Sequence, residues 1–191
     1  MTFRKLAQRI RVPAGFVLAP LLLVSAQPSV VSIALGAAVS TTGLAIRAWA
    51  SGYLRKNQEL TTTGPYARTR NPLYLGTFVL GTGIAIGSGT PWFVGLFMAL
   101  YLLIYVPVMF AEAETLRTLF SEEYDHYSRH VPLFLPRITA YRAPAPGPGG
   151  NAERERRFDT SRYLKHREYR AALGLAVVYA MLAAKFFFIN S

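Results

Sequence analysis

The sequence of 191 residues contains no cysteine, which excludes disulfide bonds, cysteine metal centres and thiol nucleophiles. Acidic residues are also scarce, with 10 Asp and Glu against 21 Lys and Arg, so the formal net charge is +11. Such a surplus is typical of proteins that contact nucleic acid or an anionic membrane surface. The basic residues flank apolar segments, and no nucleic-acid recognition motif accompanies them. We therefore expect membrane lipids as partners, no nucleic acid and no metal site.

Charge is almost absent from five apolar blocks, which raise the hydrophobic share of the chain to 52%. The blocks are Val12–Ala26, Val30–Ala50, Leu73–Gly87, Trp92–Ala111 and Ala171–Ile189. A helix that crosses a bilayer needs about 20 mainly apolar residues, and the second, fourth and fifth blocks reach that length. A second block follows the first within a few residues, so we interpret the first as a retained span and not as a signal peptide. The pattern predicts an all-α integral-membrane helical bundle of about five transmembrane helices.

The connections between the blocks predict an orientation. The segments 27–29 and 87–91 carry no charge, whereas the other connections are rich in arginine. The positive-inside rule then places the N-terminus in the cytoplasm and Ser191 outside. Lys185, near the end of the last block, is expected to extend its ammonium towards the membrane surface. A helical bundle in water would not account for the alternation of uncharged and basic connections.

Three regions follow along the chain. Residues 1–140 are predicted to form a core of four spans with a cytoplasmic helical cap, because Leu116, Phe120 and Tyr124 recur at helical spacing before Pro132. Residues 141–150 contain the linker sequence APAPGPGG. Residues 151–191 are predicted to form a basic helix followed by the fifth span. The basic helix either anchors on anionic headgroups or is an ordinary solvated helix.

The stretch GPYARTRNPLYLG, residues 64–76, enters the third block. Asn71 followed by Pro72 predicts a helix start, with Asn as the cap and Pro at the first helical position. Arg68 and Arg70 lie just before that start, where free backbone N–H groups already favour anions. Small residues permit close approach of a helix or a flat ligand, and helix packing is the commoner use for Gly81 and Gly83.

A carboxylate should lie at the same edge of the membrane. Glu112 is at the inner end of the fourth block, and a carboxylate at a membrane boundary is costly unless a cation meets it. Antiparallel hairpins place Glu112 on the same side as Asn71 and Tyr74, whereas Glu114 can simply face the cytoplasm. A ligand with a cationic part, a carboxylate and a flat ring would suit such a site.

The segments LTTTGPYARTRNPLYLG and EAETLRTLFSEEYDHYSRHVPLFLP together resemble a family of integral-membrane enzymes. This is the isoprenylcysteine carboxyl methyltransferase and phospholipid methyltransferase group, which uses S-adenosylmethionine, and the match covers roughly residues 55 to 136. The resemblance implies a catalytic role for Arg70, and a cofactor site in which Glu112 meets the amino group of S-adenosylmethionine. The implied cofactor-binding residues are Leu60, Thr61, Asn71, Tyr74, Gly76 and Glu112. Three positions depart from the family pattern: Asn71 replaces a His, Ala113 replaces the second Glu of an acidic pair, and Ser121 replaces a Gly.

The resemblance implies methyl transfer to a lipid-like or prenylated acceptor, and the acceptor's chemistry decides what else is needed. A carboxylate acceptor requires no general base, and Arg70 or Arg68 could hold it. An amine acceptor, as in a phospholipid N-methyltransferase, requires a base such as Glu114, His126 or His130. We favour the carboxylate.

Two different functions would also suit a small helical membrane protein: a sterol-type reductase that uses NADPH, and a membrane scaffold without enzymatic activity. The related reductases generally carry an acidic residue just after the tyrosine of this turn, where Leu75 stands here. A scaffold would use the glycines for helix packing and the basic loops for lipid, and it would bind no cofactor.

Overall fold

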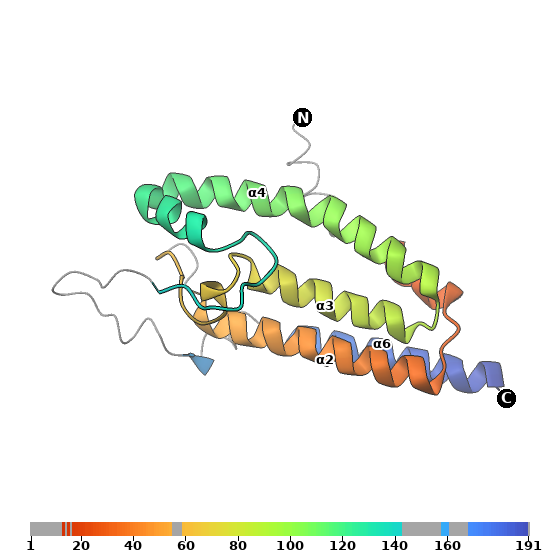
Figure 1. Cartoon of the computed structure of the whole chain (residues 1–191). Helices are drawn as coiled ribbons and strands as arrows, with labels where there is room; N and C mark the ends of the chain where they lie inside the picture. The colour runs from red at the N-terminus through yellow and green to blue at the C-terminus, as the bar shows by residue number, and fades with distance from the viewer. Residues whose placement is uncertain are drawn as a thin grey trace.

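The computed structural model describes residues 13 and 15 and the ranges 17–54, 59–142, 158–160 and 168–190. Within these ranges every regular element is a helix, and the prediction of an all-α fold is confirmed. After a helical segment at residues 17–25 come α2 (Val30–Tyr53), the short 3-10 helix η1 (Gly64–Ala67), α3 (Pro72–Gly87), α4 (Pro91–His130) and α6 (Tyr169–Asn190). The long helices run along one common direction, with α4 inclined to the others (Figure 1).

Three of the helices, α2, α4 and α6, are long and apolar enough to cross a membrane. Helix α3 is apolar but has only 16 residues, or about 24 Å at ~1.5 Å per residue, somewhat less than a ~30 Å hydrocarbon core. The chain is therefore an integral-membrane protein built as a helical bundle. The side of the membrane on which each end lies remains a prediction.

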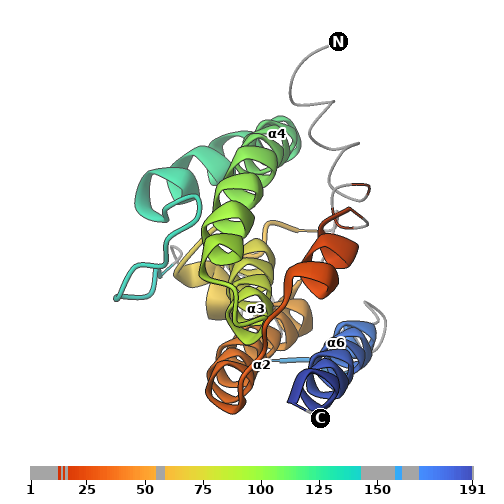
Figure 2. The same ribbon diagram turned by 90° about the vertical axis from the view of Figure 1, so that its right-hand side faces the viewer.

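Small residues form the contact between α2 and α3. A Cβ on Gly43 would lie 2.3 Å from the backbone nitrogen of Leu80, and a Cβ on Gly83 would lie 2.4 Å from that of Ser40. Gly81 faces the opposite way, where a Cβ would lie 2.2 Å from the ring of Phe97 on α4. Figure 2 shows this arrangement end-on, with α3 between α2 and α4. The helix-packing prediction for Gly81 and Gly83 is confirmed.

Helix α6 packs on the α2–α3 pair through a polar and an apolar contact. The Tyr179 hydroxyl donates to the Gly83 carbonyl at 3.1 Å and lies 3.0 Å from the Ser40 hydroxyl. Leu182 is fully buried in an apolar cluster with Phe93 and residues of the first helical segment. At the end of the bundle remote from Asn71, the Lys185 ammonium donates to the carbonyl of Val24 at 2.8 Å. Instead of extending freely to the membrane surface, this lysine caps the C-terminal end of the first helical segment.

Helix α4 joins two elements that the sequence suggested as separate. The fourth span and the helix after it form one element of 40 residues, because no proline or glycine separates Ala111 from Glu114. The only internal break is Ser121, with φ 31° and ψ −109°, which turns the last part of α4 back towards η1 (Figure 1). The helix ends at His130, just before Pro132, as predicted. The predicted linker and basic helix lie almost entirely outside the described residues, so the division into three regions remains a prediction.

Candidate functional site

The turn before α3 is held by the chain that follows α4. The amide of Arg70 donates to the carbonyl of Pro132 at 3.0 Å, and the amide of Arg137 donates to the carbonyl of Arg68 at 2.9 Å. The buried Thr69 hydroxyl donates to the carbonyl of Phe134 at 2.8 Å. Backbone and side chain thus join two segments more than sixty residues apart in sequence, which fixes the position of the RTRNP turn.

Asn71 and Pro72 begin α3 as predicted, but not by the predicted contact. Asn71 occupies the N-cap position and Pro72 the first turn, yet the Asn71 side chain makes no capping hydrogen bond. Its Nδ2 instead donates to the carbonyl of Leu133 at 2.9 Å. The expectation that the Asn71 side chain caps the helix was wrong, because the segment after α4 offers it a carbonyl. The first N–H groups of α3 therefore receive no side-chain cap from Asn71.

Tyr74 and Glu112 meet, as the hairpin topology predicted. The Tyr74 hydroxyl donates to Oε1 of Glu112 at 2.7 Å, across the gap between α3 and α4. The Tyr74 ring packs edge-on against Tyr105 with centroids 5.5 Å apart, and Tyr101 donates to the Tyr74 backbone carbonyl at 2.6 Å. Three contacts from α4 therefore hold Tyr74 in place. The phenol in turn orients the carboxylate of Glu112, which is otherwise exposed.

Arg70 is anchored beside the same edge. Its Nη1 donates to the hydroxyl of Tyr124 at 3.0 Å, and its guanidinium carbon lies 5.9 Å from the centre of the Tyr124 ring. Its Nε is buried without a hydrogen-bond partner. A buried donor without a partner costs about 1–3 kcal/mol. Arg68 goes elsewhere and donates to the carbonyl of Ile138.

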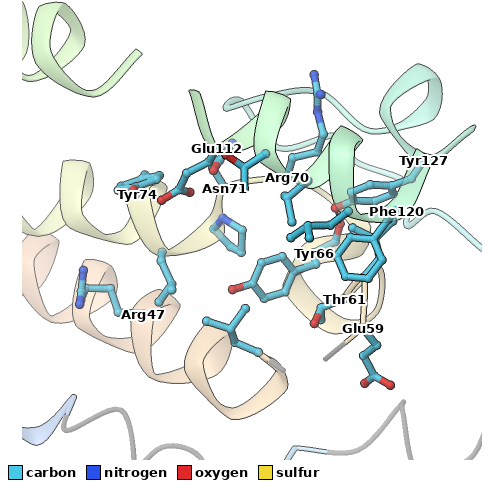
Figure 3. A pocket seen from close by; sticks show the side chains of 17 residues that line it. Arg47, Glu59, Thr61, Tyr66, Arg70, Asn71, Tyr74, Glu112, Phe120 and Tyr127 are labelled. Carbon is cyan, nitrogen blue, oxygen red and sulfur yellow. Dashed lines mark hydrogen bonds between the residues drawn. The ribbon is translucent and has the colours of Figure 1, made fainter. Parts of the chain in front are cut away.

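Arg70, Tyr74 and Glu112 line a cavity of about 480 Å³ at this end of the bundle (Figure 3). That volume lies within the roughly 300–1,000 Å³ of typical small-molecule sites. Of the predicted site residues, Leu60, Thr61, Arg70, Asn71, Tyr74 and Glu112 line it. Gly76 is not among its lining residues, because it packs against α2, where a Cβ would lie 2.6 Å from Cγ of Arg47. Arg68 and Glu114 are also absent from the lining.

Sequence reasoning missed several polar residues of the lining, among them Arg47, Glu59 and Tyr66. Arg47 lies inside the second apolar block, and a charge at such a position is itself a signal of function. Tyr66 is only 7% exposed, and Tyr127 donates to its backbone carbonyl at 2.6 Å. Burial, and after it the nearby charge of Glu112, raise the pKa of Tyr66 well above the ordinary tyrosine value. Tyr66 is therefore a neutral phenol at physiological pH.

The two histidines that could have served as bases lie on another face of α4. Nδ1 of His126 is 2.9 Å from the hydroxyl of Tyr141, and Nδ1 of His130 is 2.8 Å from the carbonyl of His126. Neither imidazole lines the cavity. In the described part of the chain, no group of three or more His, Cys, Asp or Glu side chains is placed to hold a metal ion.

Comparison with known proteins finds similarity to two metal-resistance proteins. The chain is 34% identical over 111 residues to the nickel-cobalt-cadmium resistance protein NccN of Alcaligenes xylosoxydans xylosoxydans, covering 57% of this chain and 50% of that protein. It is 32% identical over 110 residues to the cobalt-zinc-cadmium resistance protein CzcN of Cupriavidus metallidurans, covering 56% and 49%. The chain thus spans about half the length of these relatives. No solved structure matches it.

The sequence pattern of the phospholipid methyltransferase family matches residues 17–123, more than half of the chain. The matched region contains α2, η1 and α3 entire, and α4 as far as the residues that follow the Ser121 kink. It thus includes Arg70, Asn71, Tyr74 and Glu112, the side chains that the fold brings together at the cavity. The chain belongs to the phospholipid methyltransferase family of integral-membrane methyltransferases.

Proposed function

We propose that this protein transfers a methyl group from S-adenosylmethionine to the carboxylate of a lipid-like or prenylated acceptor. The observation that carries the proposal is the 2.7 Å hydrogen bond between Tyr74 and Glu112 in the cavity wall. It places an oriented carboxylate beside the start of α3, where a ligand with an ammonium and a sulfonium group can bind. The wider family supports methyl transfer, and the cofactor and acceptor are our proposals.

The residues of the cavity fit this cofactor. The Glu112 carboxylate can accept hydrogen bonds from an amino group, and the Tyr74 hydroxyl keeps it in position. Leu116 and Phe120 form an apolar wall that excludes water and can cover a flat ring. S-adenosylmethionine, when bound, supplies a methyl group that its sulfonium already activates. The protein's main task is then alignment, which can contribute on the order of 7–11 kcal/mol.

The acceptor is proposed to be a carboxylate because of Arg70 and because of where the candidate bases lie. A guanidinium holds a carboxylate well, and Arg70 lines the cavity. An amine acceptor would have to lose a proton, but Glu114, His126 and His130 are all absent from the cavity lining. Of the carboxylates that do line it, Glu112 is assigned to the cofactor. Among the described lining residues, only Glu59 would remain as a base for an amine.

The experiment is to incubate the purified protein with S-adenosylmethionine labelled in the methyl group and a total lipid extract. Methyl esters release volatile methanol in alkali, whereas N-methyl amines do not, so base lability of the label identifies the acceptor class. We expect base-labile label. Arg70→Gln should lower the rate of this transfer at least about tenfold, which corresponds to the loss of one charge-assisted hydrogen bond or more. The control is Arg129→Gln, which changes an exposed arginine on α4 and should leave the rate unchanged. Label in a base-stable amine would refute the carboxylate assignment.

A second candidate function is a role in metal resistance, which the names of the two relatives favour. Such a role is compatible with methyl transfer to a membrane component. Expression of this chain in a host that lacks its own copy should then restore growth in cobalt or cadmium. Glu112→Gln should abolish the rescue if methyl transfer is responsible. Rescue by Glu112→Gln to the same extent would separate metal resistance from the proposed chemistry.

A further inference from the structure

A partly buried ion pair, its Arg47 side chain 23% exposed, lies beside the cavity and comes from two distant parts of the chain. Nε of Arg47, on α2, donates to Oε2 of Glu168 at 3.0 Å, and Nη2 donates to Oε1 at 2.9 Å. Glu168 is only 8% exposed and immediately precedes α6. The remaining Nη1 of Arg47 donates to the hydroxyl of Thr77 on α3. This clamp therefore ties together α2, α3 and the start of α6.

The clamp also contacts the part of the cavity that lies beside Tyr74. Arg47 lines the cavity, and its stem packs against Gly76, in the second turn of α3. Thr77, its partner on α3, donates in turn to the carbonyl of Leu73 at 2.8 Å. Leu73 and Tyr74 both line the cavity. In Figure 3 the guanidinium of Arg47 is turned away from Tyr66.

The charge of Arg47 conflicts with a cationic ligand unless it is neutralised. In this partly buried position, a guanidinium that loses its carboxylate keeps an uncompensated positive charge that is attracted to other nearby acids. Glu112 and Glu59 are the acidic side chains of the described cavity lining. An unpaired Arg47 would repel a sulfonium and would compete for the carboxylate that meets the ligand's amino group.

We infer that Glu168 is a positioning residue for cofactor binding: by pairing with Arg47 it keeps that positive charge from opposing a cationic ligand in the cavity. The inference rests on the proposed function. It gives the C-terminal helix a part in the site, although α6 lies beyond the region that the family pattern matches.

The test compares two ligands that differ by one charge. S-adenosylmethionine carries a sulfonium, whereas S-adenosylhomocysteine has the same amino-acid and adenosine parts with a neutral sulfur. We expect Glu168→Gln to weaken the binding of S-adenosylmethionine about tenfold more than that of S-adenosylhomocysteine. An uncompensated charge on Arg47 would act on the sulfonium but not on the neutral sulfur, so only the affinity for S-adenosylmethionine should carry this extra loss. A merely structural role of Glu168 would weaken both ligands equally.

The control is the double variant Arg47→Gln with Glu168→Gln, which removes both charges. It should return the ratio of the two dissociation constants to the wild-type value, and Glu122→Gln, an exposed glutamate on α4, should not change it. Equal weakening of both ligands in Glu168→Gln, or no restoration in the double variant, overturns the inference. Failure of the wild-type protein to bind either ligand overturns the proposed function instead, and the inference with it.

Discussion

Ser121 has a backbone conformation that glycine adopts far more easily than serine. Its φ of 31° and ψ of −109° break α4 between the membrane part and the part that packs on η1. Such a conformation costs a non-glycine residue about 1–3 kcal/mol, and glycine removes most of that cost. Glycine also loses about 0.5–1 kcal/mol more backbone entropy on folding. The net expectation for Ser121→Gly is a stabilisation of about 1 kcal/mol, or a rise in Tm of about 2–4 °C for a chain of this size.

The assay is thermal unfolding of the purified protein in one detergent, with Ser128→Gly as the matched control. Ser128 lies in the same helix with ordinary helical geometry, so glycine there should lower stability by about 0.5 kcal/mol. The two Ser→Gly changes should therefore shift Tm in opposite directions. A decrease in Tm for Ser121→Gly similar to that for Ser128→Gly would refute the kink, because it would mean that α4 continues straight through this residue.

Three further predictions concern packing, pH and the site. Gly43→Ala should destabilise the protein by about 1–3 kcal/mol in the same melts, because the new Cβ would lie 2.3 Å from the backbone of α3. The control is Gly95→Ala, which has open space around it and should not destabilise the protein. Because burial raises the pKa of Tyr66, the folded protein keeps this proton at a pH where the unfolded chain has lost it. Stability should therefore fall as pH rises above about 10, less steeply in Tyr66→Phe, and equal slopes would contradict this. Tyr74→Phe should weaken S-adenosylhomocysteine binding about threefold to tenfold by calorimetry, and unchanged affinity would show that the bond to Glu112 does not prepare the site.

The general architecture could be predicted because the membrane imposes simple rules on sequence. Apolar blocks of known length gave the helices, and the two uncharged turns gave the hairpins that bring Tyr74 and Glu112 to one edge. The start of α3 at Pro72 and the end of α4 at His130 followed from proline. These features depend on local sequence and on topology, which a single sequence contains.

The contacts that depend on distant segments could not be predicted in the same way. The Asn71 side chain binds the carbonyl of Leu133 because the chain after α4 returns to the turn, and no local pattern announces this. Likewise the partner of Arg47 is Glu168, more than one hundred residues away. Ser121 is intermediate: its departure from the family's glycine was visible in the sequence, but its positive φ was not.

The central claim is that Glu112 and the start of α3 bind the cofactor. Titration calorimetry of S-adenosylhomocysteine into wild-type protein, Glu112→Gln and Glu122→Gln tests it most directly. We predict saturable binding to the wild type and to Glu122→Gln, and a loss of affinity of at least about tenfold, or ~1.4 kcal/mol, in Glu112→Gln. Wild-type protein that gives no saturable heat, or Glu112→Gln that binds as tightly as wild type, would contradict it.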